Sequence, residues 1–130
     1  MPTTSILLVE DNPLNRELVI ECLEDLCLDI VVAEDGAQAL ERFRERRYAV
    51  ILMDLQMPVM DGLETTRRIR HIEHSEGLGH TPVVGVTANA FPQDRLRCLD
   101  AGMDDYMSKP FDVDDFIARM AGYAQAASCS

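Results

Sequence analysis

Residues 51–62 read ILMDLQMPVMDG, and this stretch decides the fold. The apolar run that starts at Ala49 ends abruptly on the carboxylate of Asp54, and the turn dipeptide Asp61-Gly62 follows a few residues later. A short continuous apolar run bounded by turn signals is typical of a strand whose two faces are both covered. A carboxylate placed directly after it either caps the next turn or is a reactive group held at the edge of a sheet.

The same alternation of a short apolar run and a longer amphipathic stretch occurs five times. Strands are predicted at 5–10, 29–34, 49–54, 81–88 and 104–108, and helices at 12–26, 35–47, 62–74, 92–102 and 112–124. In the first helix Asn12 is a good N-cap and Pro13 suits the first helical position, while Leu14, Leu18, Cys22 and Leu26 fall on one face. The pattern predicts the α/β class: a single doubly wound (βα)5 three-layer sandwich with a parallel five-stranded sheet.

Length and composition limit what the chain can be. Its 130 residues fit one domain, predicted at 1–124, with 125–130 as a polar tail or linker. The formal net charge of −11 argues against direct nucleic-acid binding, because phosphates would be repelled. No apolar run approaches the roughly 20 residues that a membrane helix needs. The four cysteines include no CxxC pair, which favours reduced thiols and a cytoplasmic location.

Polar side chains stand at the predicted ends of four strands. Glu10 and Asp11 follow the first strand, Asp54 ends the third, Thr87 stands at the end of the fourth, and Lys109 follows the fifth. In open α/β sheets ligands bind outside the carboxyl ends of the strands, so these residues are expected to meet at one edge. Each alone has an ordinary explanation, as a cap, a strand residue or a surface charge. The joint pattern is much harder to obtain by accident.

The predicted cluster suits phosphoryl chemistry. Three carboxylates a few ångströms apart repel one another, and a divalent cation would relieve this. Ligands that are all oxygen indicate Mg²⁺, with Mn²⁺ as the alternative. An ammonium and a hydroxyl, here those of Lys109 and Thr87, are what a bound phosphoryl group needs. An ionised aspartate such as Asp54 is a competent nucleophile that forms aspartyl phosphates.

Four motifs together resemble a known family. They are ILLVEDNPLNR (6–16), VILMDLQMPVMDGLE (50–64), VVGVTANA (83–90) and AGMDDYMSKPF (101–111). In order and spacing they resemble the receiver domain of two-component response regulators, most of all the receivers of hybrid sensor histidine kinases and phosphorelays. The resemblance covers residues 5–124 and implies a flavodoxin-like fold with strand order 2-1-3-4-5.

The resemblance also implies a role for each residue of the cluster. Asp54 would be the phosphoacceptor and Lys109 would pair with the phosphoryl group, while Thr87 and Tyr106 would be the switch residues. The Mg²⁺ ligands would be Glu10, Asp11, Asp54 and the backbone carbonyl of Gln56. The chain would catalyse its own phosphorylation and dephosphorylation without turning over a separate substrate.

Partners follow from the same resemblance. The phosphoryl donor would be the phosphohistidine of a sensor histidine kinase or of a histidine phosphotransfer protein. The face formed by 92–102, 104–108 and 112–124 would change on phosphorylation, and a homodimer could form through it. A chain that is part of a membrane-bound hybrid kinase would be tethered there.

Three alternatives stay open. A Mg²⁺-dependent phosphatase with an aspartate nucleophile usually carries a second aspartate two residues later, where this chain has Gln56. An FMN carrier needs a hydroxyl- and glycine-rich loop after the first strand, whereas Glu10 and Asp11 would repel a phosphate there. The third alternative is a receiver that has lost phosphorylation, against which the intact acidic cluster, Thr87 and Lys109 argue.

Overall fold

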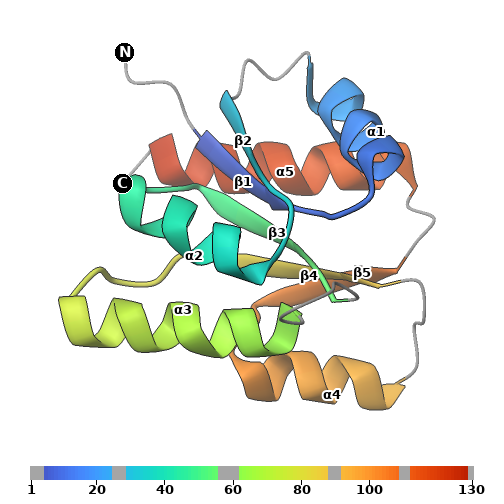
Figure 1. Ribbon diagram of the computed structural model, residues 1–130. Coiled ribbons are helices and arrows are strands. Elements are labelled where there is room, and N and C mark those ends of the chain that lie inside the picture. The colour runs from blue at the N-terminus through green and yellow to red at the C-terminus, as the bar shows by residue number, and fades with distance from the viewer. Residues whose placement is uncertain (1–4, 25–28, 56–61, 88–91, 109–111, 129–130) are drawn as a thin grey trace.

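A computed structural model describes residues 5–24, 29–55, 62–87, 92–108 and 112–128 of the chain (Figure 1). Five strands alternate with five helices, as the sequence predicts. In chain order these elements are β1 (Ser5–Val9), α1 (Pro13–Leu23), β2 (Asp29–Ala33), α2 (Gly36–Glu45), β3 (Val50–Asp54), α3 (Gly62–Glu76), β4 (Val83–Thr87), α4 (Pro92–Ala101), β5 (Asp105–Ser108) and α5 (Val113–Ser128).

The five strands form one parallel sheet in the order β2-β1-β3-β4-β5, which confirms the predicted fold. The register pairs Val9 with Met53 and Asp54 with Val86. Because all strands run the same way, their carboxyl ends meet at one edge. This topology brings the carboxyl ends of β1, β3 and β4 together although they are far apart in the chain.

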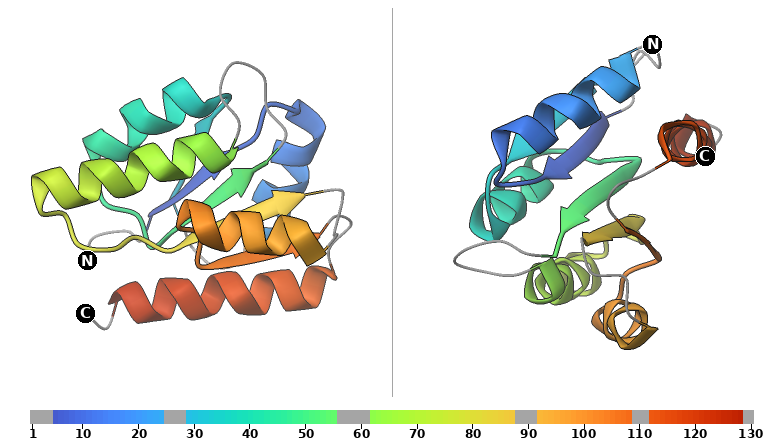
Figure 2. Two further views of the ribbon diagram at one scale, coloured as in Figure 1. Left: turned by 90° about the horizontal axis from the view of Figure 1, so that it is seen from below. Right: turned by 90° about the vertical axis from the view of Figure 1, so that its right-hand side faces the viewer.

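Helices cover both faces of the sheet. Helices α1 and α5 lie on one face, and α2, α3 and α4 lie on the other (Figure 2). Along β1, Leu7 packs into the core under α2 to α4, whereas its neighbour Leu8 packs into the core under α1 and α5. Successive strand residues point to opposite faces. Two covered faces therefore account for the continuous apolar runs of the sequence.

Capping residues set where the helices begin. Asn12 accepts hydrogen bonds from the backbone N–H groups of Leu14 (2.9 Å) and Asn15 (3.4 Å), and Pro13 is the first residue of α1, as predicted. Asp35 caps α2 through the N–H of Gln38 at 2.8 Å. Each cap satisfies backbone donors that a helix start leaves without an intrahelical partner.

Two features differ from the sequence prediction. Helix α1 packs on the sheet through Val19 and Leu23, while Leu14 and Leu18 are 70% and 59% exposed, so their shared face points to solvent. Helix α5 continues to Ser128, four residues beyond the helix end that the sequence predicts at 124. Alanine is the best helix former, and this stretch is rich in it.

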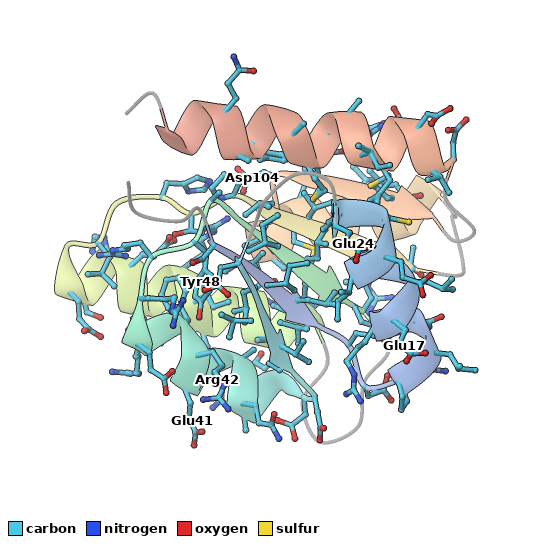
Figure 3. All side chains as sticks on the ribbon, turned by 90° about the horizontal axis from the view of Figure 1, so that it is seen from above. Glu17, Glu24, Glu41, Arg42, Tyr48 and Asp104 are labelled. Atoms are coloured by element: carbon cyan, nitrogen blue, oxygen red, sulfur yellow. The ribbon has the colours of Figure 1, made fainter. Side chains whose placement is uncertain are left out.

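Charged side chains cover the outer side of α2, and Figure 3 shows Glu41 pointing away from the sheet. Among the helices described, none combines the length and apolar character that crossing a membrane requires.

Candidate functional site

Three carboxylates meet at the carboxyl edge of the sheet. Glu10 and Asp11 follow β1, Asp54 ends β3, and one oxygen of each lies within 4.8 Å of the others. Glu10 and Asp54 are only 4% and 5% exposed, whereas Asp11 is exposed. The structure thus brings together the three acidic residues that the sequence predicts at this edge.

The backbone around Glu10 is fixed on two sides. Its N–H donates to the carbonyl of Ala33 at 3.0 Å, which extends the pairing of β1 with β2 by one residue. Its carboxylate accepts the N–H of Asn12 at 3.2 Å, and the Arg16 guanidinium donates to its carbonyl at 3.3 Å. The Arg16 contact could not be predicted from the sequence, because it depends on how α1 lies against the end of β1.

Asp54 is held by the sheet and by the start of α3. The next N–H, that of Leu55, donates to the carbonyl of Val86 at 3.0 Å, so β3 stays paired with β4 past the carboxylate. Gly62 lies so close that a Cβ there would come within 2.5 Å of the Asp54 carbonyl oxygen. Only glycine permits this approach, and it fixes the start of α3 beside the acidic residue.

The donor set matches a hard divalent cation. All three groups offer oxygen, and Mg²⁺ in proteins is typically bound by one or two carboxylates together with water and phosphate oxygens. Two carboxylates that are almost fully buried cost free energy when both are ionised side by side, and a cation offsets this cost. The three residues therefore fit a Mg²⁺ site by their chemistry.

The two predicted switch residues lie on neighbouring strands. Thr87 ends β4 and is 3% exposed, and Tyr106 in β5 is half-buried. The register pairs Tyr106 with Gly85, and Thr87 lies two residues after Gly85 in β4. Side chains two apart in a strand share a face, so Thr87 and Tyr106 emerge on the same side of the sheet.

Two predicted site residues, Gln56 and Lys109, lie outside the described residues. Their roles as a carbonyl ligand and as the phosphoryl-binding ammonium stay predictions.

Comparison with known proteins agrees with the geometry. Residues 6–121 match the family described as the response regulator receiver domain. The sensor histidine kinase RcsC of Salmonella typhi is 42% identical over 121 residues, which are 92% of this chain and 12% of that protein. The chain spans only 6% of a second relative, a hybrid signal transduction histidine kinase of Dictyostelium discoideum.

Solved structures share the fold. The receiver domain of the sensor histidine kinase PA1611 from Pseudomonas aeruginosa, which has a magnesium ion coordinated in its active site cleft, matches with a TM-score of 0.83 and 38% identity, over 95% of this chain and 99% of that one. The receiver domain of Ssk1 from Saccharomyces cerevisiae, crystallised with the histidine phosphotransfer protein Ypd1, matches with a TM-score of 0.86 and 27% identity, over 95% and 90% of the two chains.

Proposed function

The chain belongs to the response regulator receiver domain family, and we propose that Asp54 is the residue that accepts a phosphoryl group in it. One observation carries this assignment. Asp54 is an almost fully buried carboxylate at a strand end, with Glu10 and Asp11 oxygens within 4.8 Å. Burial of a carboxylate costs free energy, and a nucleophile must be held rigidly and must face a site outside the core.

The proposed transfer moves a phosphoryl group from a histidine nitrogen of the donor to a carboxylate oxygen of Asp54. One carboxylate oxygen of Asp54 attacks the phosphorus of a phosphohistidine, and the O–P bond forms as the P–N bond breaks. The departing imidazole nitrogen keeps the electron pair and takes up a proton. When the aspartyl phosphate is hydrolysed, a water oxygen attacks the phosphorus and the O–P bond to Asp54 breaks. This restores the carboxylate and releases inorganic phosphate and a proton.

Glu10, Asp11 and Asp54 would hold Mg²⁺, joined by the predicted carbonyl ligand of Gln56. When bound, the ion neutralises the charge that gathers on the phosphoryl oxygens. The chain itself orients the nucleophile through the pairing of β3 with β4 and the close contact of Gly62. The ammonium of Lys109 would pair with the phosphoryl group.

The output would pass through Thr87 and Tyr106. A phosphoryl group on Asp54 offers new acceptor oxygens at the end of β3, and Thr87 carries a hydroxyl donor at the end of the neighbouring strand. Movement of Thr87 would free space on the side of the sheet that Tyr106 shares, and the aromatic ring would turn inward. The surface of α4, β5 and α5 would change as a result, and homodimers would use the same surface.

The phosphoryl donor would dock on α1, next to the acidic residues Glu10, Asp11 and Asp54. Leu14 and Leu18 are four residues apart on this helix, and both are mostly exposed. Side chains spaced by four stand above one another on a helix, so they form one apolar strip that starts next to Asp11. An apolar strip next to a buried nucleophile supports docking of a protein donor such as a histidine phosphotransfer protein.

Incubation with acetyl phosphate and Mg²⁺, followed by intact-mass measurement, tests the proposal. We expect a gain of one phosphoryl group that is labile to hydroxylamine, is lost on chelation of Mg²⁺ and is absent in Asp54→Asn. The matched control is Asp100→Asn, an exposed carboxylate on α4, which should be phosphorylated normally. A stable phosphate-free chain under all conditions would overturn the proposal, and multiple turnover of phosphate esters would favour the phosphatase.

A further inference from the structure

A groove of about 460 Å³ lies between α2 and α3, outside the acidic site. The two helices run side by side on the face of the sheet opposite α1 and α5 (Figure 2). The described residues that line the groove all belong to these two helices: Leu40, Arg44, Glu64, Arg67, Arg68, His71 and Ile72. The volume is within the range of about 300 to 1,000 Å³ typical of ligand sites in proteins.

The charge of this region differs from that of the rest of the chain. Residues 36–76 contain seven arginines and seven acidic residues, so the formal charge of −11 belongs entirely to the remainder. Of the described residues that line the groove, three are arginines and one is a glutamate. The groove is therefore a positive region on a strongly acidic protein, and this asymmetry selects a negatively charged occupant.

The arginines of the groove are available to a ligand. Arg67 and Arg68 share one carboxylate, that of Glu64, at 3.5 and 3.2 Å, and Arg44 contacts Glu76 at 3.3 Å. All three arginine side chains are more than half exposed. Ion pairs of this exposed kind contribute little to stability, so a guanidinium loses little when it exchanges its partner for a ligand carboxylate.

The rest of the lining indicates what kind of ligand fits. Leu40 and Ile72 form an aliphatic floor between the arginines of the two helices. Among the described residues that line the groove the single ring is the small imidazole of His71, and none is Phe, Tyr or Trp, so a nucleobase would find little stacking area. An aliphatic floor between basic walls suits a segment with an apolar anchor flanked by carboxylates.

We propose that this groove docks an acidic amphipathic helix of a partner protein. A helix that binds in a groove between two helices turns an apolar stripe toward the groove floor. Residues that flank this stripe on the partner helix then reach the two walls of the groove. An aliphatic side chain of the partner would rest on Leu40, and its glutamates or aspartates would pair with Arg44 of α2 and Arg67 of α3. The groove lies on the other side of the sheet from α1, so this partner and a phosphoryl donor can bind together.

The test uses a synthetic probe and the whole chain labelled with ¹⁵N. The probe is a capped helical peptide of about 14 residues, four turns, with leucine on one stripe and glutamate on both flanks. We expect backbone amide shifts concentrated in residues 40–44 and 64–72, weaker at higher salt. Peptides with every glutamate changed to glutamine, or every leucine to alanine, should bind about tenfold more weakly or worse.

Matched variants of the chain complete the test. Arg67→Glu and Arg44→Glu each reverse one charge in the groove and should weaken the probe about tenfold. Arg95→Glu makes the same change on the exposed side of α4 and should leave binding unchanged. Shifts elsewhere on the chain, no binding at low salt, or equal loss in Arg95→Glu would overturn the proposal. The proposal would also be overturned if the chain formed a concentration-dependent dimer that Arg67→Glu disrupts and the peptide does not compete with. Binding of pyrophosphate in the groove, with no binding of the peptide there, would overturn it as well.

Discussion

The guanidinium of Arg70 lies 2.9 Å from the carboxylate of Asp104, 34 residues further along the chain. The same guanidinium donates to the carbonyls of Thr81 and Gly102, both at 2.8 Å, and to the carboxylate of Glu73 at 2.7 Å. Arg70 therefore joins α3 to the segment before β4 and to the turn before β5. Since β5 carries Tyr106, this contact fixes one end of the strand that the proposed switch uses.

Replacement of Arg70 by methionine should destabilise the fold strongly. Glu73 is 5% exposed, and without the guanidinium its negative charge would keep the N–H of Thr81, at 2.6 Å, as a donor but would lose its cationic partner Arg70. Loss of one partner of a buried ion pair typically costs about 3 kcal/mol or more. Urea unfolding should show this loss, whereas Arg68→Met, which breaks only an exposed pair, should cost less than about 1 kcal/mol. Equal losses in the two variants would contradict the assignment.

Gly102 should not tolerate alanine. Its φ is +104°, and a Cβ there would lie 2.8 Å from Cγ of Arg70. Both effects oppose a side chain, so Gly102→Ala should lower the free energy of unfolding by about 1 to 3 kcal/mol. Gly122→Ala is the matched control, because it lies within α5 with open space around it. That variant should gain about 0.5 to 1 kcal/mol, since glycine is a poor helix former.

Stability should fall in alkaline solution because of two tyrosines. Burial raises the pKa of Tyr48 above its ordinary 10.0, and burial followed by Asp105 and Asp104 raises the pKa of Tyr123. Above pH about 10 the unfolded chain loses these protons before the folded chain does, so the free energy of unfolding decreases as the pH rises further. Below that pH both states keep the protons and no loss occurs.

The measurement is urea unfolding between pH about 9 and 11.5. Tyr48→Phe should flatten the decline and also cost about 1 kcal/mol at neutral pH, because its hydroxyl donates to the carbonyl of Arg42 at 2.8 Å (Figure 3). Tyr123→Phe should flatten the decline further. An unchanged slope in the double variant would show that other groups cause it.

Most of the fold follows from the sequence because its signals are local. Each element is indicated by a few neighbouring residues. Continuous apolar runs indicate strands, Asn12 with Pro13 indicates a helix start, and Asp54 followed by Asp61-Gly62 indicates a strand end and a turn. Parallel topology then places Glu10, Asp11 and Asp54 at one edge of the sheet, and the strand order implied by the family resemblance makes the first and third strands neighbours. The acidic site could thus be predicted before any contact between its residues was known.

The orientation of α1 could not be predicted in the same way. The helix carries two apolar stripes, one with Leu14 and Leu18 and one with Val19 and Leu23, and helical periodicity fits both. Which stripe is buried depends on the angle at which α1 meets the sheet. The contacts of Arg70 could not be predicted from the sequence either, because they join residues that are distant in sequence and depend on tertiary packing.

Removal of one charge from the acidic site should stabilise the chain in the absence of metal. Glu10, Asp11 and Asp54 repel one another within 4.8 Å, so Asp54→Asn should raise the free energy of unfolding by about 1 kcal/mol in chelator. Mg²⁺ should raise the Tm of the unaltered chain through mass action and should have much less effect on the variant. Thermal unfolding with and without Mg²⁺ measures both effects, with Asp100→Asn as the control. A variant less stable than the unaltered chain in chelator would contradict the repulsion argument.

Leu14 and Leu18 should matter only when the phosphoryl donor is a protein. Both side chains are mostly exposed and make little contribution to the core, so Leu14→Ala and Leu18→Ala should fold normally. Loss of apolar contact at the donor interface should slow transfer from a phosphorylated histidine phosphotransfer protein about tenfold. Phosphorylation by acetyl phosphate should keep its rate, because a small donor needs no docking surface. Leu96→Ala, at a leucine 65% exposed on α4, is the matched control and should change neither rate. Equal slowing with both donors would mean that the leucines act on the acidic site itself, and no slowing with the protein donor would remove α1 from the docking surface.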